Sequence, residues 1–120
     1  MTDSITIYHN PRCSKSRATL AMLRDAGHEP EVVLYLDEPP SAARLKQLLQ
    51  AMGLSAREIM RPKEPPYKEL GLADESLSED VLIEHMVAHP ILIERPIVVA
   101  GDEVRLCRPA ERVQELIGAS

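Results

Sequence analysis

The chain has 120 residues, of which 44% are hydrophobic and 28% are charged, so we expect one soluble domain, residues 1–120, around one core. A formal net charge of −5 argues against general nucleic-acid binding, which needs a basic face. No apolar stretch approaches the length of a membrane span, and the N-terminus lacks the pattern of a signal peptide. With only two cysteines, these features predict a cytoplasmic protein without a disulfide scaffold or a membrane partner.

The first third of the sequence predicts a strand-helix-strand unit. Residues 5–8 alternate apolar and polar side chains, as a strand does. Residues 14–26 follow with apolar side chains at helical spacing, and Gly27 is a typical C-terminal stop. Residues 31–35 form a second apolar run. This order favours two parallel strands joined by a right-handed crossover.

The middle of the chain is predicted to be helical. Ser41 opens a helix that Gly53 ends, and four apolar side chains form its buried stripe. Residues 54–77 are less regular, because three prolines interrupt any long helix. Ser78 is followed by two acidic residues and opens a further helix, which Pro90 closes.

The last quarter predicts a hairpin and a helix. Residues 97–100 form an apolar strand, Gly101 and Asp102 suit a tight turn, and residues 103–107 return antiparallel. Pro109 suits the first turn of a final helix. The prediction is therefore an α/β fold: a small mixed four-stranded sheet flanked by helices, with a helical insertion between its β-α-β and β-β-α halves.

Cys13 lies directly between the first predicted strand and the first predicted helix. Free backbone N–H groups and the positive end of the dipole stabilise a thiolate at a helix start. Arg12, Lys15 and Arg17 add positive charge nearby. A free cysteine has a pKa of about 8.5, and such surroundings lower it by one to several units. Because the same N–H groups can hold an oxyanion, the sequence predicts thiol attack on an oxyanion or on a disulfide.

Three arginines each precede a proline: Arg61, Arg95 and Arg108. The following proline biases each arginine away from helical geometry and stiffens the segment. Guanidinium groups bind oxyanions through two parallel hydrogen bonds and keep their charge near neutral pH. Three such pairs in one small chain predict a preorganised anion clamp, provided that the fold brings them together.

The order of elements resembles the thioredoxin fold. In that fold a cis-proline directly before the third strand faces the cysteine, and Pro96 stands in that place. We therefore predict a cis peptide bond between Arg95 and Pro96. Most redox-active members carry Cys-x-x-Cys, whereas the fourth position here is Ser16. A local disulfide cannot form, so any resolving thiol must come from elsewhere.

Four runs of sequence together resemble the glutaredoxin-coupled arsenate reductase (ArsC) family: residues 9–17, 66–72, 89–99 and 105–109. The resemblance implies that Cys13 attacks arsenate as a nucleophile and that Arg61, Arg95 and Arg108 bind the oxyanion. It also implies glutathione as co-substrate, glutaredoxin as redox partner, arsenite as product and no bound cofactor. Supporting roles fall to other residues of the shared runs: Asn10, Ser16, Arg17 and Pro96.

Two residues have competing interpretations. His9 precedes Cys13 by four positions and is either a plain turn residue or, as we favour, an imidazolium that lowers the pKa of the thiol. Cys107 lies at a strand end with no helix start before it, so a structural or semi-exposed thiol is expected. The histidines and cysteines lack the spacing of metal ligands, so no metal site is expected.

Two other functions fit parts of the pattern. A glutathione-dependent thiol reductase of the same superfamily keeps the cysteine but is expected to lose part of the arginine set. A regulator that binds RNA polymerase, like the Spx-type relatives, typically carries a Cys-x-x-Cys switch. Ser16 argues against that switch, and the complete arginine set argues against both alternatives.

Overall fold

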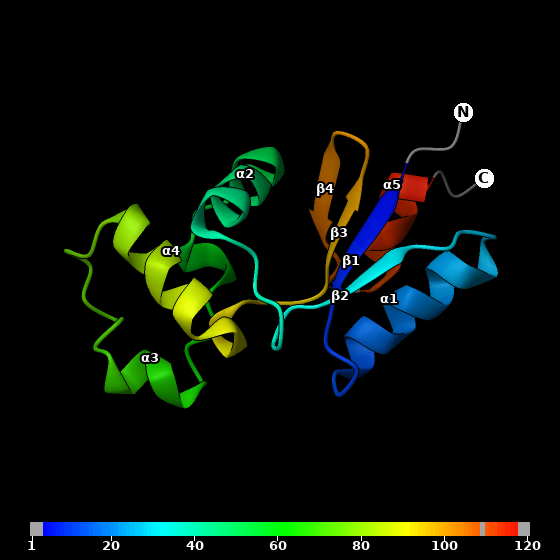
Figure 1. Ribbon diagram of the computed structural model, residues 1–120. Helices are drawn as coiled ribbons and strands as arrows, with labels where there is room; N and C mark the ends of the chain where they lie inside the picture. Colours follow the sequence, from blue (N-terminus) through cyan, green and yellow to red (C-terminus); the bar gives the residue numbers. More distant parts are fainter. Residues whose placement is uncertain (1–3, 109, 118–120) are drawn as a thin grey trace. The chain divides into compact units, whose positions relative to one another are not determined.

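The structure is a computed structural model that describes residues 4–108 and 110–117 (Figure 1). The chain divides into two compact units. The first contains the residues up to Glu38 and those from Arg95 onward, and the second is Pro39–Glu94. The second unit corresponds to the predicted helical insertion. That residues 1–120 act as a single domain stays a prediction.

The first unit contains a four-stranded mixed sheet with the strand order β2-β1-β3-β4. Strand β1 pairs in parallel with β2 and antiparallel with β3, and β3 pairs antiparallel with β4. This confirms the predicted sheet and the hairpin at Gly101, whose φ is +61°. The strands are β1 (Ile5–His9), β2 (Glu31–Leu34), β3 (Ile97–Ala100) and β4 (Glu103–Leu106).

Helix α1 (Ser14–Asp25) follows β1 after a short loop and packs beside the 3-10 helix η3 (Ala110–Val113). Helix α5 (Gln114–Ile117) continues from η3, and Pro109, the predicted helix start, lies outside the described residues. Side chains of the helices and strands meet in one core cluster. The cluster contains Ile5, Ile7, Leu20, Leu23, Val98, Cys107 and Val113.

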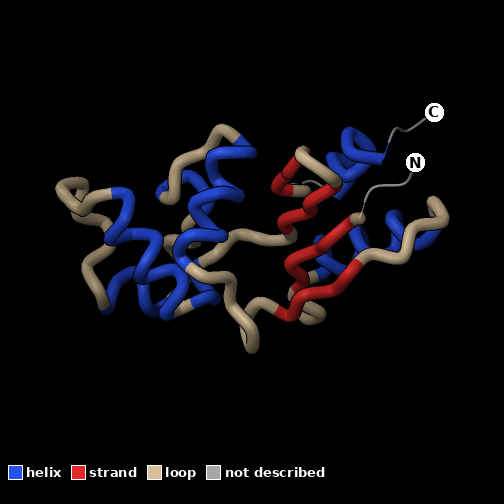
Figure 2. Tube along the Cα trace, turned by 45° about the horizontal axis from the view of Figure 1, so that its top comes forward, coloured by secondary structure: helices blue, strands red, loops and turns tan. Residues whose placement is uncertain are grey.

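The second unit is built from helices, and the strands drawn in red in Figure 2 all belong to the first unit. Ser41 and Ser78 cap α2 and α4 as predicted, each accepting a backbone N–H three residues later. Gly53 ends α2 with a φ of +69°, a conformation that suits glycine. The elements are α2 (Ala42–Met52), η1 (Arg57–Ile59), α3 (Pro65–Glu69), α4 (Glu79–Ala88) and η2 (Pro90–Leu92).

Two details differ from the sequence-based expectation. Pro65 and Pro66 occupy the first turn of α3, so these prolines begin a short helix in the segment expected to be irregular. Proline fits there because the first N–H groups of a helix have no partner within it. Strands β2 and β4 each end one residue earlier than predicted. No helix among the described residues has both the length and the apolar character needed to cross a membrane.

Candidate active site

Cys13 occupies the N-cap position of α1, directly after the loop that leaves β1. Its backbone is held on both sides: its N–H donates to the carbonyl of Asn10 at 3.0 Å, and its carbonyl accepts the N–H of Arg17 at 3.0 Å. The side chain is partly exposed and makes no close capping hydrogen bond to the helix. The sulfur therefore lies at the open N-terminus of α1, as the sequence predicts.

The surroundings of Cys13 favour its thiolate. Burial alone would raise the pKa of the thiol, but the N–H groups of Ser16 and Lys15 and the guanidinium of Arg95 outweigh it. The pKa of Cys13 is therefore below its usual value. Helix N-terminal N–H groups and a nearby cation are the environment in which protein thiols become nucleophilic.

Ser16 joins the active-site loop to α1. Its side chain is fully buried, and its Oγ shares a 2.6 Å hydrogen bond with Nδ1 of His9. The same Oγ accepts the backbone N–H of Asn10 at 3.1 Å. Asn10 Oδ1 in turn accepts the N–H of Arg12 at 2.9 Å, and Arg17 donates to the carbonyl of Pro11 at 3.0 Å. These contacts tie together the loop that precedes Cys13, and supporting roles for Asn10, Ser16 and Arg17 stay a prediction.

His9 differs from the expectation of an imidazolium. Its side chain is only 5% exposed. Burial, together with the positive charges of Arg24 and Arg17, lowers the pKa of His9 below 6.5. The imidazole is therefore mainly neutral at pH 7 and does not supply a positive charge to Cys13. Sequence spacing missed this because the two arginines approach His9 from the turns of α1.

Arg95 and Arg108 lie together in the first unit. Arg108 donates from Nη1 to the backbone carbonyl of Arg95 at 3.2 Å, and the Arg95 guanidinium contacts the Cys13 thiol. The peptide bond between Arg95 and Pro96 is cis, which confirms that prediction. Nε and Nη1 of Arg95 are buried and have no hydrogen-bond partner within the described part of the chain. Unpaired buried donors are rare, and here they lie on a cation beside the thiol.

Arg61 belongs to the second unit and is ion-paired. Its Nη1 contacts Glu94 at 2.5 Å, and its Nε contacts Glu64 at 3.2 Å. Of the three arginines expected to surround one oxyanion, Arg95 contacts Cys13 and Arg108 contacts the backbone of Arg95. Arg61 as the third member of the anion clamp stays a prediction.

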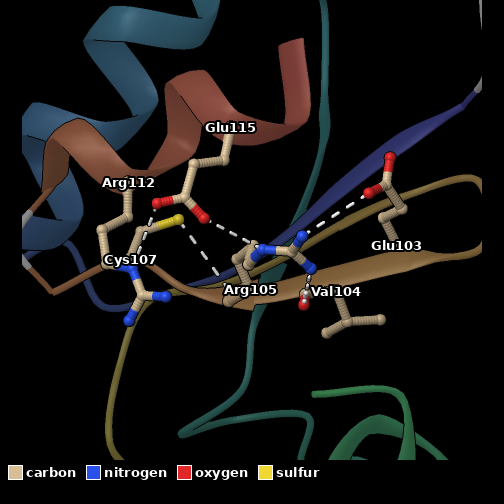
Figure 3. Close-up of polar contacts among 6 residues, drawn as sticks. All are labelled: Glu103, Val104, Arg105, Cys107, Arg112 and Glu115. Carbon is tan, nitrogen blue, oxygen red and sulfur yellow. Dashed lines mark hydrogen bonds and ion pairs between the residues drawn. The ribbon is translucent and has the colours of Figure 1, made fainter. Parts of the chain in front are cut away.

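Cys107 contrasts with Cys13. It is fully buried in the core cluster, and burial raises the pKa of its thiol to about 12. The sulfur lies 3.9 Å from the carbonyl of Arg105. Figure 3 shows Arg105 and Arg112 both pairing with Glu115 of α5 beside this thiol. The expectation of a structural cysteine is confirmed.

A groove of about 270 Å³ borders the same loop from the side of β2. It is lined by His9, Asn10, Pro11, Arg12, Leu34, Leu36 and Asp37. Leu34 and Leu36 are more than one-third exposed, and sequence reasoning did not connect them with the active site. Among the described residues, no group of three or more His, Cys, Asp or Glu side chains is placed to hold a metal ion.

The model of the ArsC family matches residues 8–116, which include the loop, Cys13 and all three arginines. The chain belongs to the ArsC family. Relatives agree over most of their length. A protein of Escherichia coli K12 named YfgD, described as uncharacterized, is 60% identical over 98% of this chain and all of its own. An arsenate reductase of Rhizobium meliloti is 53% identical over 95% of this chain and 81% of its own.

Solved structures of the ArsC family share the fold. An arsenate reductase from Vibrio cholerae superposes with a TM-score of 0.92 and is 51% identical, covering 97% of this chain and 99% of its own. This similarity confirms the predicted thioredoxin-like architecture and the resemblance to arsenate reductases.

Proposed function

We propose that this ArsC-family protein is an arsenate reductase in which Cys13 is the nucleophile and glutathione and glutaredoxin supply the electrons. Two neighbouring features carry the proposal. The pKa of the Cys13 thiol is lowered, and Nε and Nη1 of the adjacent Arg95 are buried without a hydrogen-bond partner among the described residues. Arsenate carries one to two negative charges at neutral pH and needs such donors. Without fixed cations, its repulsion from the thiolate would oppose attack.

In the proposed reaction the Cys13 thiolate forms a sulfur–arsenic bond, and one arsenate oxygen leaves as water after protonation. A glutathione thiol then displaces a second oxygen, which leaves as water. A glutaredoxin thiolate attacks the glutathione sulfur, and the electron pair of the broken sulfur–arsenic bond stays on arsenic, which becomes As(III). Hydrolysis of the remaining Cys13–arsenic bond releases arsenite and regenerates the Cys13 thiol. Over a full cycle arsenate and two thiols give arsenite, one disulfide and water, so two electrons reach arsenic. Arg95 and Arg108 hold the developing negative charge, while Ser16 and His9 position the loop.

The need for an external thiol is supported by the fate of the chain's two cysteines. Cys107 is buried and has a pKa of about 12, so it is a poor partner for a mixed disulfide or arsenic adduct. Ser16 occupies the position of a local resolving cysteine. The reducing thiols must then come from another molecule, as glutathione and glutaredoxin do. This implies a reducing compartment, and we propose the cytoplasm.

The test is arsenite production from arsenate by the purified protein with glutathione and glutaredoxin, and with each omitted in turn. We expect arsenite only when arsenate, glutathione and glutaredoxin are all present. Consumption of glutathione that does not depend on arsenate would instead favour a general thiol reductase. Arsenite production that persists without glutaredoxin would refute the proposed electron route while leaving Cys13 as nucleophile.

A further inference from the structure

Arg61 is held between two carboxylates in the second unit. Glu94 contacts Nη1 and Glu64 contacts Nε, and all three side chains are only about one-fifth exposed, at 21%, 23% and 19% for Arg61, Glu94 and Glu64. We call these three residues the Arg61 cluster. In it, one guanidinium contacts two carboxylates.

Backbone pairing sets the geometry of the Arg61 cluster. Met60 and Ile93 form an isolated antiparallel bridge. On either side of it, Arg61 N–H donates to Leu92 at 2.8 Å and Glu94 N–H donates to Ile59 at 2.8 Å. Arg61 thus lies opposite Leu92 and Glu94 lies opposite Ile59. Arg61 and Glu94 are diagonal neighbours across this pairing although they are 33 residues apart, and their side chains meet. Backbone hydrogen bonds hold the two residues near each other, so the contact between them does not depend on the side chains alone.

Glu64 reaches the same guanidinium from the start of α3. Its N–H lies 3.3 Å from the carbonyl of Arg61, which closes a tight turn between the two residues. Burial disfavours the charged form of Arg61, but Glu94 and Glu64 outweigh it and raise the pKa of the guanidinium. The cation is thus permanent, and two of its donor nitrogens already face carboxylate oxygens.

Arg61 and Arg95 therefore differ in whether Nε and Nη1 already have hydrogen-bond partners. Nε and Nη1 of Arg95 have no partner among the described residues, whereas Nε and Nη1 of Arg61 are both engaged. A tetrahedral oxyanion binds a guanidinium through two parallel N–H donors, either Nε with Nη2 or Nη1 with Nη2. Each of these pairs includes a nitrogen of Arg61 that a carboxylate already engages. An anion that engages Arg61 in this way must displace at least one carboxylate.

We propose that Glu94 and Glu64 are positioning residues that compete with the oxyanion for Arg61 and so set the affinity of the protein for anions. The inference rests on the proposed function, with Arg61 taken as the predicted third arginine that binds the oxyanion. Glu94 is expected to dominate, because its contact is the shorter one and the backbone pairing holds it in place.

The test compares wild type with Glu94→Gln, which keeps the size of the side chain and removes its charge. Sulfate, an unreactive tetrahedral dianion, is titrated calorimetrically, and kcat and KM for arsenate are measured separately. On the scale of a partly buried charge-assisted contact, sulfate Kd and arsenate KM should fall roughly three- to ten-fold, with kcat little changed. Glu84→Gln, an exposed glutamate on α4, is the charge-matched control and should leave both constants unchanged.

A double-variant cycle separates competition from a general change of field. In an Arg61→Ala background, Glu94→Gln should no longer improve sulfate binding, because there is no guanidinium to release. A gain that persists without Arg61, or sulfate binding by Glu94→Gln no tighter than wild type, would overturn the proposal. Glu64→Gln should shift binding the same way by less, and it provides a second route if Glu94→Gln folds poorly.

Sulfate binding needs no thiol chemistry, so this result is independent of the reductase assay. Arsenate turnover by wild type together with unchanged binding in Glu94→Gln would refute the competition and leave the proposed function standing. Tighter sulfate binding in Glu94→Gln without arsenate turnover by wild type would do the reverse.

Discussion

The two cysteines of this protein lie in the same compact unit, yet the fold gives them opposite chemistry. Cys13 is partly exposed at the N-terminus of α1, where N–H groups and Arg95 lower the pKa of its thiol. Cys107 lies fully buried among apolar side chains, where burial raises the pKa of its thiol to about 12. Both are within reach of arginines, since Arg105 and Arg112 lie near Cys107.

The difference shows that a nearby positive charge alone does not activate a thiol. At Cys107 the loss of solvation dominates, and Glu115 also opposes ionisation. At Cys13 the backbone N–H groups of Ser16 and Lys15 and the guanidinium of Arg95 outweigh burial and lower the pKa of the thiol. Direct hydrogen bonds to the charged form therefore matter more than the count of basic neighbours.

The largest expected effect comes from exchanging the reactive thiol. Cys13→Ser should lower arsenate kcat/KM by at least about a thousand-fold, because a serine hydroxyl is not ionised near neutral pH and catalysis loses its nucleophile. Arsenite formation in the full assay measures this. Cys107→Ala is the matched control and should keep at least half of the activity. Substantial turnover by Cys13→Ser would contradict the contrast between the two thiols, because the thiol at α1 would then not be the nucleophile.

Removing Arg95 or Arg108 should have the next largest effect. Arg95→Ala and Arg108→Ala should each cost roughly 2–4 kcal/mol of transition-state stabilisation, about a thirty- to thousand-fold drop in kcat/KM. Arg95→Lys should rescue only partly, because an ammonium cannot form the planar two-bond contact. Arg112→Ala removes an arginine that pairs with Glu115 and serves as the control. Unchanged arsenate kinetics in Arg95→Ala and Arg108→Ala would favour a general thiol reductase.

The positioning role of Ser16 predicts a loss of stability. Ser16→Ala leaves the buried N–H of Asn10 and Nδ1 of His9 without their shared partner, which should cost about 1–3 kcal/mol of unfolding free energy. Urea unfolding measures the loss. Ser14→Ala, an exposed change two residues away, should stay within about 0.5 kcal/mol of wild type. Equal stability of the two variants would mean that the hydroxyl is not needed to hold the loop.

The two thiols should also respond to pH with opposite signs. The lowered pKa of Cys13 contributes stability that is present above the unfolded pKa and is lost as pH falls through the folded one. The raised pKa of Cys107 contributes stability that is complete below the unfolded value, about 8.5, and is lost as pH rises toward 12.

Alkylation and unfolding together measure this contrast. Iodoacetamide should modify Cys13 in the folded protein with a midpoint below about 8.5, and Cys107 only after unfolding. Above that pH, the free energy of unfolding of wild type should fall by up to about 1.4 kcal/mol per pH unit relative to that of Cys107→Ala. Modification of Cys107 in the folded protein at a rate similar to Cys13 would contradict the buried setting.

Near neutral pH, Cys107→Ala is expected to have the smallest effect on the free energy of unfolding. It removes one sulfur from the core and should cost about 1–2 kcal/mol through the small cavity left behind. Thermal unfolding measures the loss. A cost within error of zero would place the sulfur outside the tight core.

The sequence by itself determined the features that depend on local rules. The helix starts at Ser41 and Ser78, the stop at Gly53 and the turn at Gly101 follow from capping and from backbone conformations that glycine adopts easily. The position of Cys13 at a strand-to-helix turn was equally local. The cis bond before Pro96 was predicted from the order of elements together with the thioredoxin-like resemblance.

Only the tertiary structure decided how the charged side chains pair. The pKa of His9 is lowered because the fold buries the side chain and α1 brings two arginines near it. Arg61 meets Glu94 because a backbone ladder joins segments 33 residues apart, while Nε and Nη1 of Arg95 are left without partners among the described residues. Such pairings depend on which side chains meet in the folded chain. The spacing of residues along the sequence does not show which distant residues will meet.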